Sequence, residues 1–260
     1  MGQLTAATAA PDQIEYLDKG AQTKVGRDYK QRLITALNLQ PGHRVVDLGC
    51  GPGTDLRSLA DAVGSVGSVI GIDQDPRMLD QARQRLADRS NVELHQGDIH
   101  ELPFPDSSVD RVRVDRVLQH VDEPEKVIAE VRRVLRPGGL FALAEPDWDT
   151  LAVADEDIET SRRFARYTAD RVRNNTLGRQ LPRLCLKAGL QVRSIDPIPA
   201  MFADFPTADL ILGLRRNAAR AVLDGVIPEA DAEAWVGRLE NGPVLAGFTF
   251  YLVIAQQPAP

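Results

Sequence analysis

Residues 45–53 of this chain read VVDLGCGPG, a short apolar run with one aspartate followed by three alternating glycines. The run from Arg44 to Leu48 has the composition of a buried β-strand, and residues Thr54 to Val63 place apolar side chains at helical spacing. Glycines between a strand and a helix let the backbone turn tightly and approach a ligand with no Cβ in the way. The segment therefore predicts a ligand-binding turn in an open α/β sheet.

The pattern of short β-rich runs and longer helical stretches continues to residue 144. Strands separated by helices of this length predict right-handed crossovers and a doubly wound, mostly parallel sheet. Two later strands are expected to complete a Rossmann-like sheet of seven strands, in which the last strands are antiparallel. The expected strands are residues 44–48, 69–73, 92–96, 109–114, 140–144, 191–195 and 249–254.

Helical segments are expected outside this sheet. Residues 1–39 are predicted to form an N-terminal helical lid, and residues 40–260 the main α/β domain. A helical cap insertion is expected at about residues 200–240, before the last strand. At that place it would cover the carboxyl edge of the sheet, where open α/β folds bind their ligands.

Length and composition limit the function. The chain has 260 residues, enough for one large domain or one domain with an appendage. Its 31 basic and 37 acidic side chains give a net charge of -6, which argues against a nucleic-acid partner. Its 2 cysteines provide neither a disulfide framework nor a zinc site, and no apolar stretch approaches the roughly 20 residues of a membrane span. We expect a cytoplasmic protein with a small-molecule partner, no metal and no membrane span; a homodimer is left open.

Three aspartates stand at or near the ends of successive expected strands. Asp73 is placed to accept hydrogen bonds from both hydroxyls of a ribose. Asp98 is placed to accept from an adenine amino group, with Ile99 packing on the ring. Asp47, just before the glycines, favours a ligand with a cationic group over a phosphate. For any one of these residues a turn or capping role is the alternative.

Further blocks in the chain carry a family resemblance over residues 40–146. The matching segments are VVDLGCGPG (45–53), GIDQDPRML (71–79), QGDIHELPFPDSSVD (96–110), VLQHVDEP (117–124) and VLRPGGLFALAEP (134–146). Together they resemble the class I S-adenosylmethionine-dependent methyltransferases, in particular the small-molecule group that includes the ubiquinone and menaquinone biosynthesis enzymes (the methyltransferase type 11 group). The resemblance implies S-adenosylmethionine as cofactor and S-adenosylhomocysteine as product.

The resemblance also implies which residues contact the methionine part of the cofactor. Gly49 and Gly51 would touch it, and Asp47 would lie near its amino group. Asp115 and Arg116, where the fourth strand ends, would face the cofactor. The direction of the Arg116 side chain stays open between the cofactor carboxylate and an acid such as Glu145.

The same resemblance implies contacts to the adenosine part of the cofactor. Asp73 would hold the ribose. Gln74 and Met78 would surround the adenine, and Asp98 with Ile99 would meet its edge.

A sulfonium is already an activated electrophile, so the protein chiefly has to align it with the nucleophile. A base is needed only if the nucleophile arrives protonated. His120, after the fourth strand, is the general-base candidate; the alternative is a loop or packing role. Glu145 and Trp148, after the fifth strand, form a second candidate set for a substrate hydroxyl or amine. Tyr16 is a candidate pocket residue of the lid.

The predicted activity is methyl transfer to an O, N or C nucleophile of a small organic molecule, in secondary or quinone-like metabolism. A nicotinamide-dependent oxidoreductase is the alternative, disfavoured because Thr54 stands where the dinucleotide fingerprint needs its third glycine. A non-catalytic cofactor-binding module is a further alternative. The acidic pI of about 5.3 argues against a fourth alternative, the methylation of nucleic acid.

Overall fold

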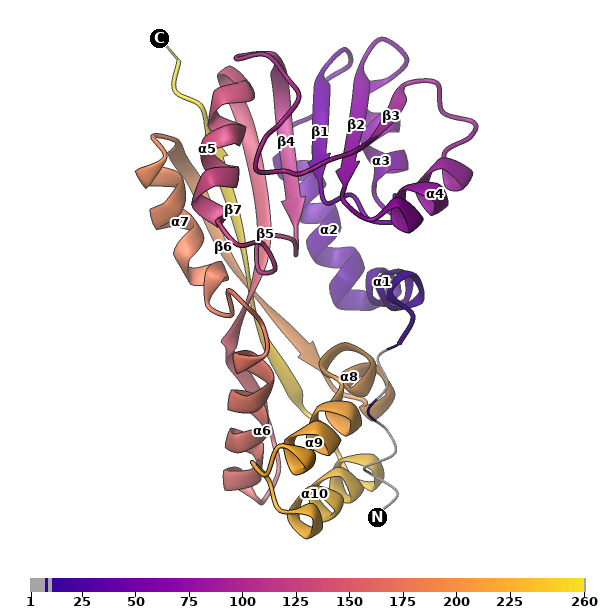
Figure 1. The fold of residues 1–260 in the computed structure, drawn as a ribbon, viewed down its shortest axis with the longest axis vertical. Helices are drawn as coiled ribbons and strands as arrows, with labels where there is room; N and C mark the ends of the chain where they lie inside the picture. The colour runs from indigo at the N-terminus through magenta and orange to yellow at the C-terminus, as the bar shows by residue number, and fades with distance from the viewer. Residues whose placement is uncertain (1–7, 9–10, 260) are drawn as a thin grey trace.

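A seven-stranded sheet with strand order β3-β2-β1-β4-β5-β7-β6 forms the centre of the protein (Figure 1). In the computed structural model, residue 8 and residues 11–259 are described. All strands run in one direction except β7, which is antiparallel to both β5 and β6. The strands are β1 (Arg44–Leu48), β2 (Ser68–Asp73), β3 (Val92–Gln96), β4 (Val109–Asp115), β5 (Leu135–Val153), β6 (Gln191–Phe202) and β7 (Ala246–Gln256).

Helices cover both faces of this sheet. Apolar side chains of α2 (Lys24–Ala36), α3 (Leu56–Val63) and α4 (Pro76–Arg85) belong to one core cluster. Those of α5 (Pro124–Val134) and α7 (Leu177–Lys187) belong to a second cluster, on the opposite face. The predicted Rossmann-like, doubly wound fold is therefore confirmed.

The strands β5, β6 and β7 are much longer than expected. The 19-residue β5 continues to Val153, whereas the sequence predicted a strand that ends at Ala144. Pairing with β7 persists beyond Glu145 because a register shift between Asp147 and Ala152 absorbs the extra residues. The polar, proline-containing stretch after Ala144 conceals this continuation in the sequence. The result is a three-stranded extension beyond the parallel part of the sheet.

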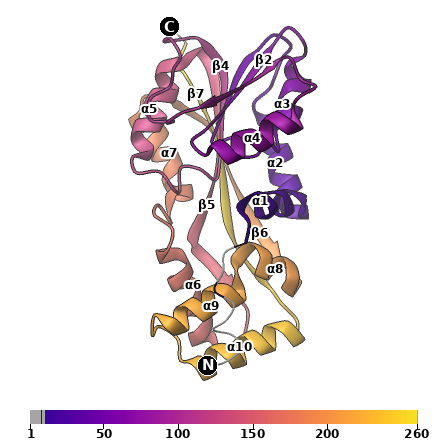
Figure 2. The ribbon, with the colours of Figure 1, turned by 45° about the vertical axis from the view of Figure 1, so that its right-hand side comes forward.

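Four helices lie around this extension, well away from β1 to β3 in both views (Figures 1 and 2), and two of them contact its strands directly. Three of them lie in the segment between β6 and β7, where helical residues were expected. They are α6 (Ile158–Asp170), α8 (Phe205–Leu212), α9 (Leu214–Leu223) and α10 (Glu229–Asn241). Their apolar side chains join the same core cluster as those of α2 and α3.

The N-terminal segment forms two helices, α1 (Gln13–Gln22) and α2. They meet at Thr23, whose hydroxyl donates to the carbonyl of Gly20 and accepts from the amide of Gly26. Helix α1 contacts α8. Of the expected lid, residues 1–7, 9 and 10 lie outside the described residues. The division into a lid (1–39), a main domain (40–260) and a cap insertion stays a prediction.

A buried ionic cluster joins β1, β4, α2 and the start of α3. The Arg113 guanidinium, 2% exposed, donates to both oxygens of Asp47 at 2.8 and 3.0 Å. It also donates to Asp55 at 2.6 Å and to Asp115 at 2.9 Å. Lys30 of α2 adds a second cation, which binds Asp115 at 2.8 Å and also pairs with Asp55. With Arg116, whose Nε lies 3.5 Å from Asp115, three cations and three carboxylates thus offset one another.

Among the described residues, no helix combines the length and the apolar character that a membrane crossing requires. The cytoplasmic location and the homodimer stay predictions.

Replacing Arg113 tests how much the ionic cluster contributes to the free energy of unfolding. In Arg113→Met, Asp47 loses its cation and the other two carboxylates keep only Lys30 and Arg116, so we expect the free energy of unfolding to fall by about 3–5 kcal/mol. Urea unfolding followed by circular dichroism measures it. The control is Arg193→Met on the exposed β6, which should change stability by less than about 0.5 kcal/mol. Equal effects of the two substitutions would show that the cluster adds no net stability.

Candidate active site

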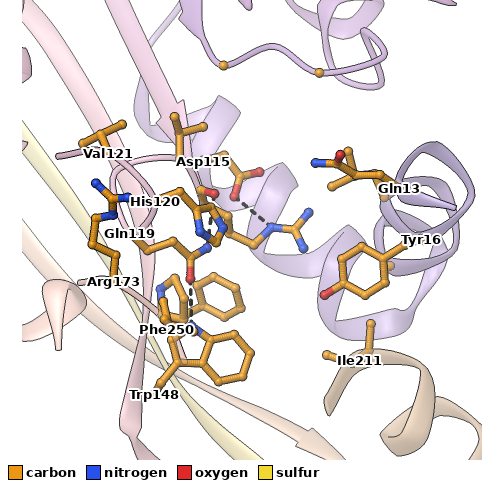
Figure 3. Close-up of a pocket in the computed structure, with 18 of the residues that line it drawn as sticks. Gln13, Tyr16, Asp115, Gln119, His120, Val121, Trp148, Arg173, Ile211 and Phe250 are labelled. Carbon is orange, nitrogen blue, oxygen red and sulfur yellow. Dashed lines mark hydrogen bonds and ion pairs between the residues drawn. The ribbon is translucent and has the colours of Figure 1, made fainter. Parts of the chain in front are cut away.

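A cavity of about 1090 Å³ opens at the carboxyl edge of the sheet. The loops after β1 to β4 form one side of it, and α1, α8 and α9 form the other. Figure 3 shows Tyr16 of α1 and Ile211 of α8 across the cavity from His120 and Trp148. The volume is enough for a cofactor and a small organic molecule together.

The glycine turn after β1 requires glycine at its first position. Gly49 has φ of +65°, and a Cβ there would lie 2.3 Å from a methyl carbon of Val117. The amide of Gly51 donates to Asp73 at 2.8 Å. The second oxygen of Asp73 accepts from the amide of Asp75 at 2.9 Å, at the start of α4. The turn between β1 and α3 is therefore held to the end of β2 by the Asp73 carboxylate.

The side chains expected around the adenosine line one part of the cavity. Asp73, Gln74, Met78, Asp98 and Ile99 all belong to its wall. Met78 and Ile99 are buried and offer apolar surface. Asp98 is exposed, and hydrogen bonds from the amide and ring of His100 lower its pKa.

The residues that line this part of the cavity fit S-adenosylmethionine. The carboxylate of Asp73 retains acceptor capacity for ribose hydroxyls, Met78 and Ile99 present surface for a flat base, and Gly49 and Gly51 line the cavity without side chains.

Asp47 lies elsewhere than expected. Its carboxylate is 2% exposed, does not belong to the cavity wall and is occupied by Arg113. The reason is the register of the sheet, in which Asp47 of β1 is paired with Arg113 of β4. Burial raises the pKa of Asp47 to about 6 even though Arg113 opposes the change. Any effect of Asp47 on the cofactor is therefore indirect.

Asp115 and Arg116 both reach the cavity. Burial alone would raise the pKa of Asp115, but Lys30 and Arg113 hold it well below its usual range. Arg116 has φ of +58°, a strained conformation for a side-chain-bearing residue. Its Nε lies 3.5 Å from Asp115, so the acid that it contacts is Asp115 and not Glu145, and a contact with the cofactor carboxylate stays a prediction.

Glu145 is placed behind the cavity wall and not in it. Its side chain is fully buried, and Oε1 accepts from the amides of Val117 at 2.9 Å and Leu118 at 2.7 Å. Burial raises the pKa of Glu145 to about 8. Oε2 has no partner among the described residues. Glu145 thus holds the loop that carries His120 and does not touch the cavity.

His120 and Trp148 do line the cavity (Figure 3). Partial loss of hydration, together with the cations Arg116 and Arg173, lowers the pKa of His120 below its usual value. The indole of Trp148 donates to Gln119 at 2.7 Å. This bond fixes Trp148 beside the His120 loop.

β7 contributes an aromatic wall that was not predicted from the sequence. Phe248 and Phe250 line the cavity, and Phe248 stacks on Trp148 with ring centroids 4.7 Å apart. Phe250 stacks on Tyr29 of α2 at the same distance. The alternation of the two phenylalanines along β7 was the available signal, since residues two apart share a face of a strand.

The sheet order and the cavity at the glycine turn are those of a Rossmann-like fold of the S-adenosylmethionine-dependent methyltransferase type. Residues 39–189 match the family described as "Methyltransferase domain". The chain belongs to this methyltransferase family, and S-adenosylmethionine is its cofactor, as predicted.

The curated relatives include one uncharacterised protein and one methyltransferase. The chain is 48% identical over 250 residues to an uncharacterised 37.1 kDa protein of transposon TN4556 from Streptomyces fradiae, covering 96% of this chain and 72% of that protein. It is 36% identical over 125 residues to the demethylmenaquinone methyltransferase of Staphylococcus aureus, covering 48% of this chain and 52% of that enzyme. The chain thus matches only about half the length of that enzyme.

A solved structure shares the fold. A putative methyltransferase from Bacillus halodurans superposes with a TM-score of 0.66 at 18% identity, covering 89% of this chain and 100% of that one.

The buried Glu145 predicts a specific pH dependence of stability. The unfolded chain ionises Glu145 near 4.5, whereas the folded protein keeps the proton up to about pH 8. Between these values the folded state binds more protons, so this residue's contribution to stability falls as pH rises. Glu145→Gln cannot titrate. The free energy of unfolding of Glu145→Gln minus that of wild type should therefore increase as the pH rises from about 5 to about 9.

Urea unfolding across that pH range measures the difference. The exposed Glu101→Gln is the matched control and should keep a constant difference from wild type. A Glu145→Gln curve parallel to that of wild type would show that Glu145 is ionised in the folded protein.

Proposed function

We propose that the protein transfers a methyl group from S-adenosylmethionine to an O, N or C nucleophile of a small organic molecule, in secondary or quinone-like metabolism. The observation that carries this proposal is one continuous cavity with two kinds of wall. The glycine turn, Asp73 and Ile99 lie at the cofactor side, and Trp148, Phe248 and Phe250 provide aromatic surface for a second molecule. The likeness to a demethylmenaquinone methyltransferase supports a quinone-like acceptor.

The bound cofactor supplies an activated methyl group, and the chain's own residues position the acceptor. Trp148 and Phe248 would hold an apolar ring. His120 would accept the proton of the nucleophile. Its lowered pKa leaves the imidazole neutral at neutral pH, the form that a general base requires.

Cofactor choice is tested by calorimetric titration with S-adenosylhomocysteine and with NADH. We expect wild type to bind S-adenosylhomocysteine and not NADH. Asp73→Ala should weaken binding at least about tenfold, because a carboxylate that accepts from ribose hydroxyls makes charge-assisted hydrogen bonds. Asp73→Asn keeps the side-chain size and an acceptor oxygen for Gly51, so it separates loop support from loss of charge.

Asp80→Ala on the exposed side of α4 is the control and should bind normally. Tighter binding of NADH than of S-adenosylhomocysteine by wild type would favour the oxidoreductase alternative. Cofactor binding without any methylated product would favour the non-catalytic one.

General-base catalysis is tested with His120→Gln. Acceptors are found by mass spectrometry from a panel of phenols, quinols and amines, using cofactor with a deuterium-labelled methyl group. For a protonated acceptor we expect turnover to fall by about 10²–10⁴. In wild type, kcat/KM should rise with pH through the lowered pKa of His120 and then level off, and the variant should lose this rise.

His43→Gln, in the turn before β1, is the control and should keep the wild-type profile. If His120→Gln retains wild-type turnover from about pH 6 to about pH 9, His120 serves only in packing.

A further inference from the structure

Two arginines of α9 face the cavity from the side opposite the glycine turn. Arg216 and Arg220 are four residues apart on α9, so they occupy one face of the helix, and both line the cavity. In both views α9 lies beyond α1, away from the tips of β1 and β2 (Figures 1 and 2). The two side chains therefore belong to the acceptor side of the cavity.

Neither arginine is neutralised by an acid. Among the described residues, Arg216 and Arg220 form no ion pair, and the sequence outside them, residues 1–7, 9, 10 and 260, contains no Asp or Glu. The Nε of Arg216 is buried and has no hydrogen-bond partner in this part of the chain. Arg220 donates to the backbone carbonyl of Thr8 at 2.8 Å.

The other arginines near this part of the cavity differ in this respect. Arg215, next to Arg216, is paired with Asp209 at 2.9 Å and with Glu240. Arg171 lies 3.6 Å from Asp224, and Arg173 is paired with Asp122. The missing counter-charge is thus particular to the two cavity-facing arginines of α9.

A half-buried pair of like charges is unfavourable unless something compensates it. Loss of hydration and the neighbouring Arg220 lower the pKa of Arg216, and the opposing effects of Tyr16 and Asp209 do not cancel this change, so the charged form of Arg216 is disfavoured. A planar guanidinium with free N–H groups is suited to a carboxylate, phosphate or sulfate group, which it binds through charge-assisted hydrogen bonds. The same cavity wall carries Phe202 and Phe248, whose ring centroids lie 6.4 Å apart.

We propose that the methyl acceptor is an amphipathic anion, with an apolar, ring-sized body against the aromatic wall and an anionic group held by Arg216 and Arg220. The inference rests on the proposed function and specifies its substrate class. It also assigns α9 a role in selecting the acceptor, because a neutral molecule of the same shape leaves both guanidinium groups without an anionic partner.

Matched aromatic probes test the charge requirement in the full chain saturated with S-adenosylhomocysteine. The probes are 2-naphthoate, 2-naphthyl phosphate and the neutral 2-naphthamide, titrated by calorimetry. We expect at least one anion to bind at least about tenfold more tightly than the amide, a difference of about 1.4 kcal/mol. In the double variant Arg216→Gln with Arg220→Gln this preference should disappear, while affinity for the amide stays within about twofold.

The variant's own affinity for S-adenosylhomocysteine separates the possible failures. It should equal that of wild type, which also shows that the variant is folded; Arg193→Gln on β6 is the control for removal of an arginine. Equal binding of anions and amide by wild type, no binding of either anion, or a preference that survives in the variant would overturn the proposal. Loss of S-adenosylhomocysteine affinity in the variant would assign these arginines to the cofactor and overturn it too. Failure of wild type to bind S-adenosylhomocysteine at all would instead refute the proposed function.

Discussion

The guanidinium of Arg113 is the constraint on which the cofactor side of the protein depends. It lies between β1 and β4 and binds carboxylates from β1, from the residue before α3 and from the end of β4. Because each carboxylate needs the cation in a dry interior, these elements have few alternative arrangements. Lys30 extends the same network to α2. The beginning of α3, and with it the glycine turn, is thereby fixed relative to the strand that ends at Asp115 and leads to His120.

The parallel half of the sheet was predictable because its signals are local. β1 and β2 are short apolar runs, β3 and β4 place valine or leucine between polar residues, and Asp75 caps α4 directly before Pro76. The extension of β5, β6 and β7 was not predictable in this way. It depends on pairing between residues about a hundred positions apart, such as Pro146 with Phe250, and on a bulge after Asp147 that hides the strand in the sequence.

The residues of the candidate site also differ in how well the sequence alone predicts their positions. Asp73, Asp98 and Ile99 follow strand ends, and the topology of an open sheet brings such residues to one edge without further information. Asp47 lies next to the end of β1, and Glu145 lies where the parallel pairing of β5 with β4 ends, yet one pairs with Arg113 across the sheet and the other binds loop amides. A sequence shows that a carboxylate is near the edge, but its direction depends on the register of the neighbouring strand and on which amides lack partners.

β5 connects the two halves of the cavity. Glu145 holds the loop with His120, and three residues later Trp148 stacks on Phe248 and donates to Gln119 of that same loop. The position of the proposed base and the position of the aromatic wall are therefore set by one strand, and they cannot shift independently. The arginines of α9 lie outside this coupling, since α9 reaches the cavity from the segment between β6 and β7. Substitutions in α9 can therefore change which acceptor is bound. The position of His120 relative to the cofactor side does not change with them, because it is set by β5.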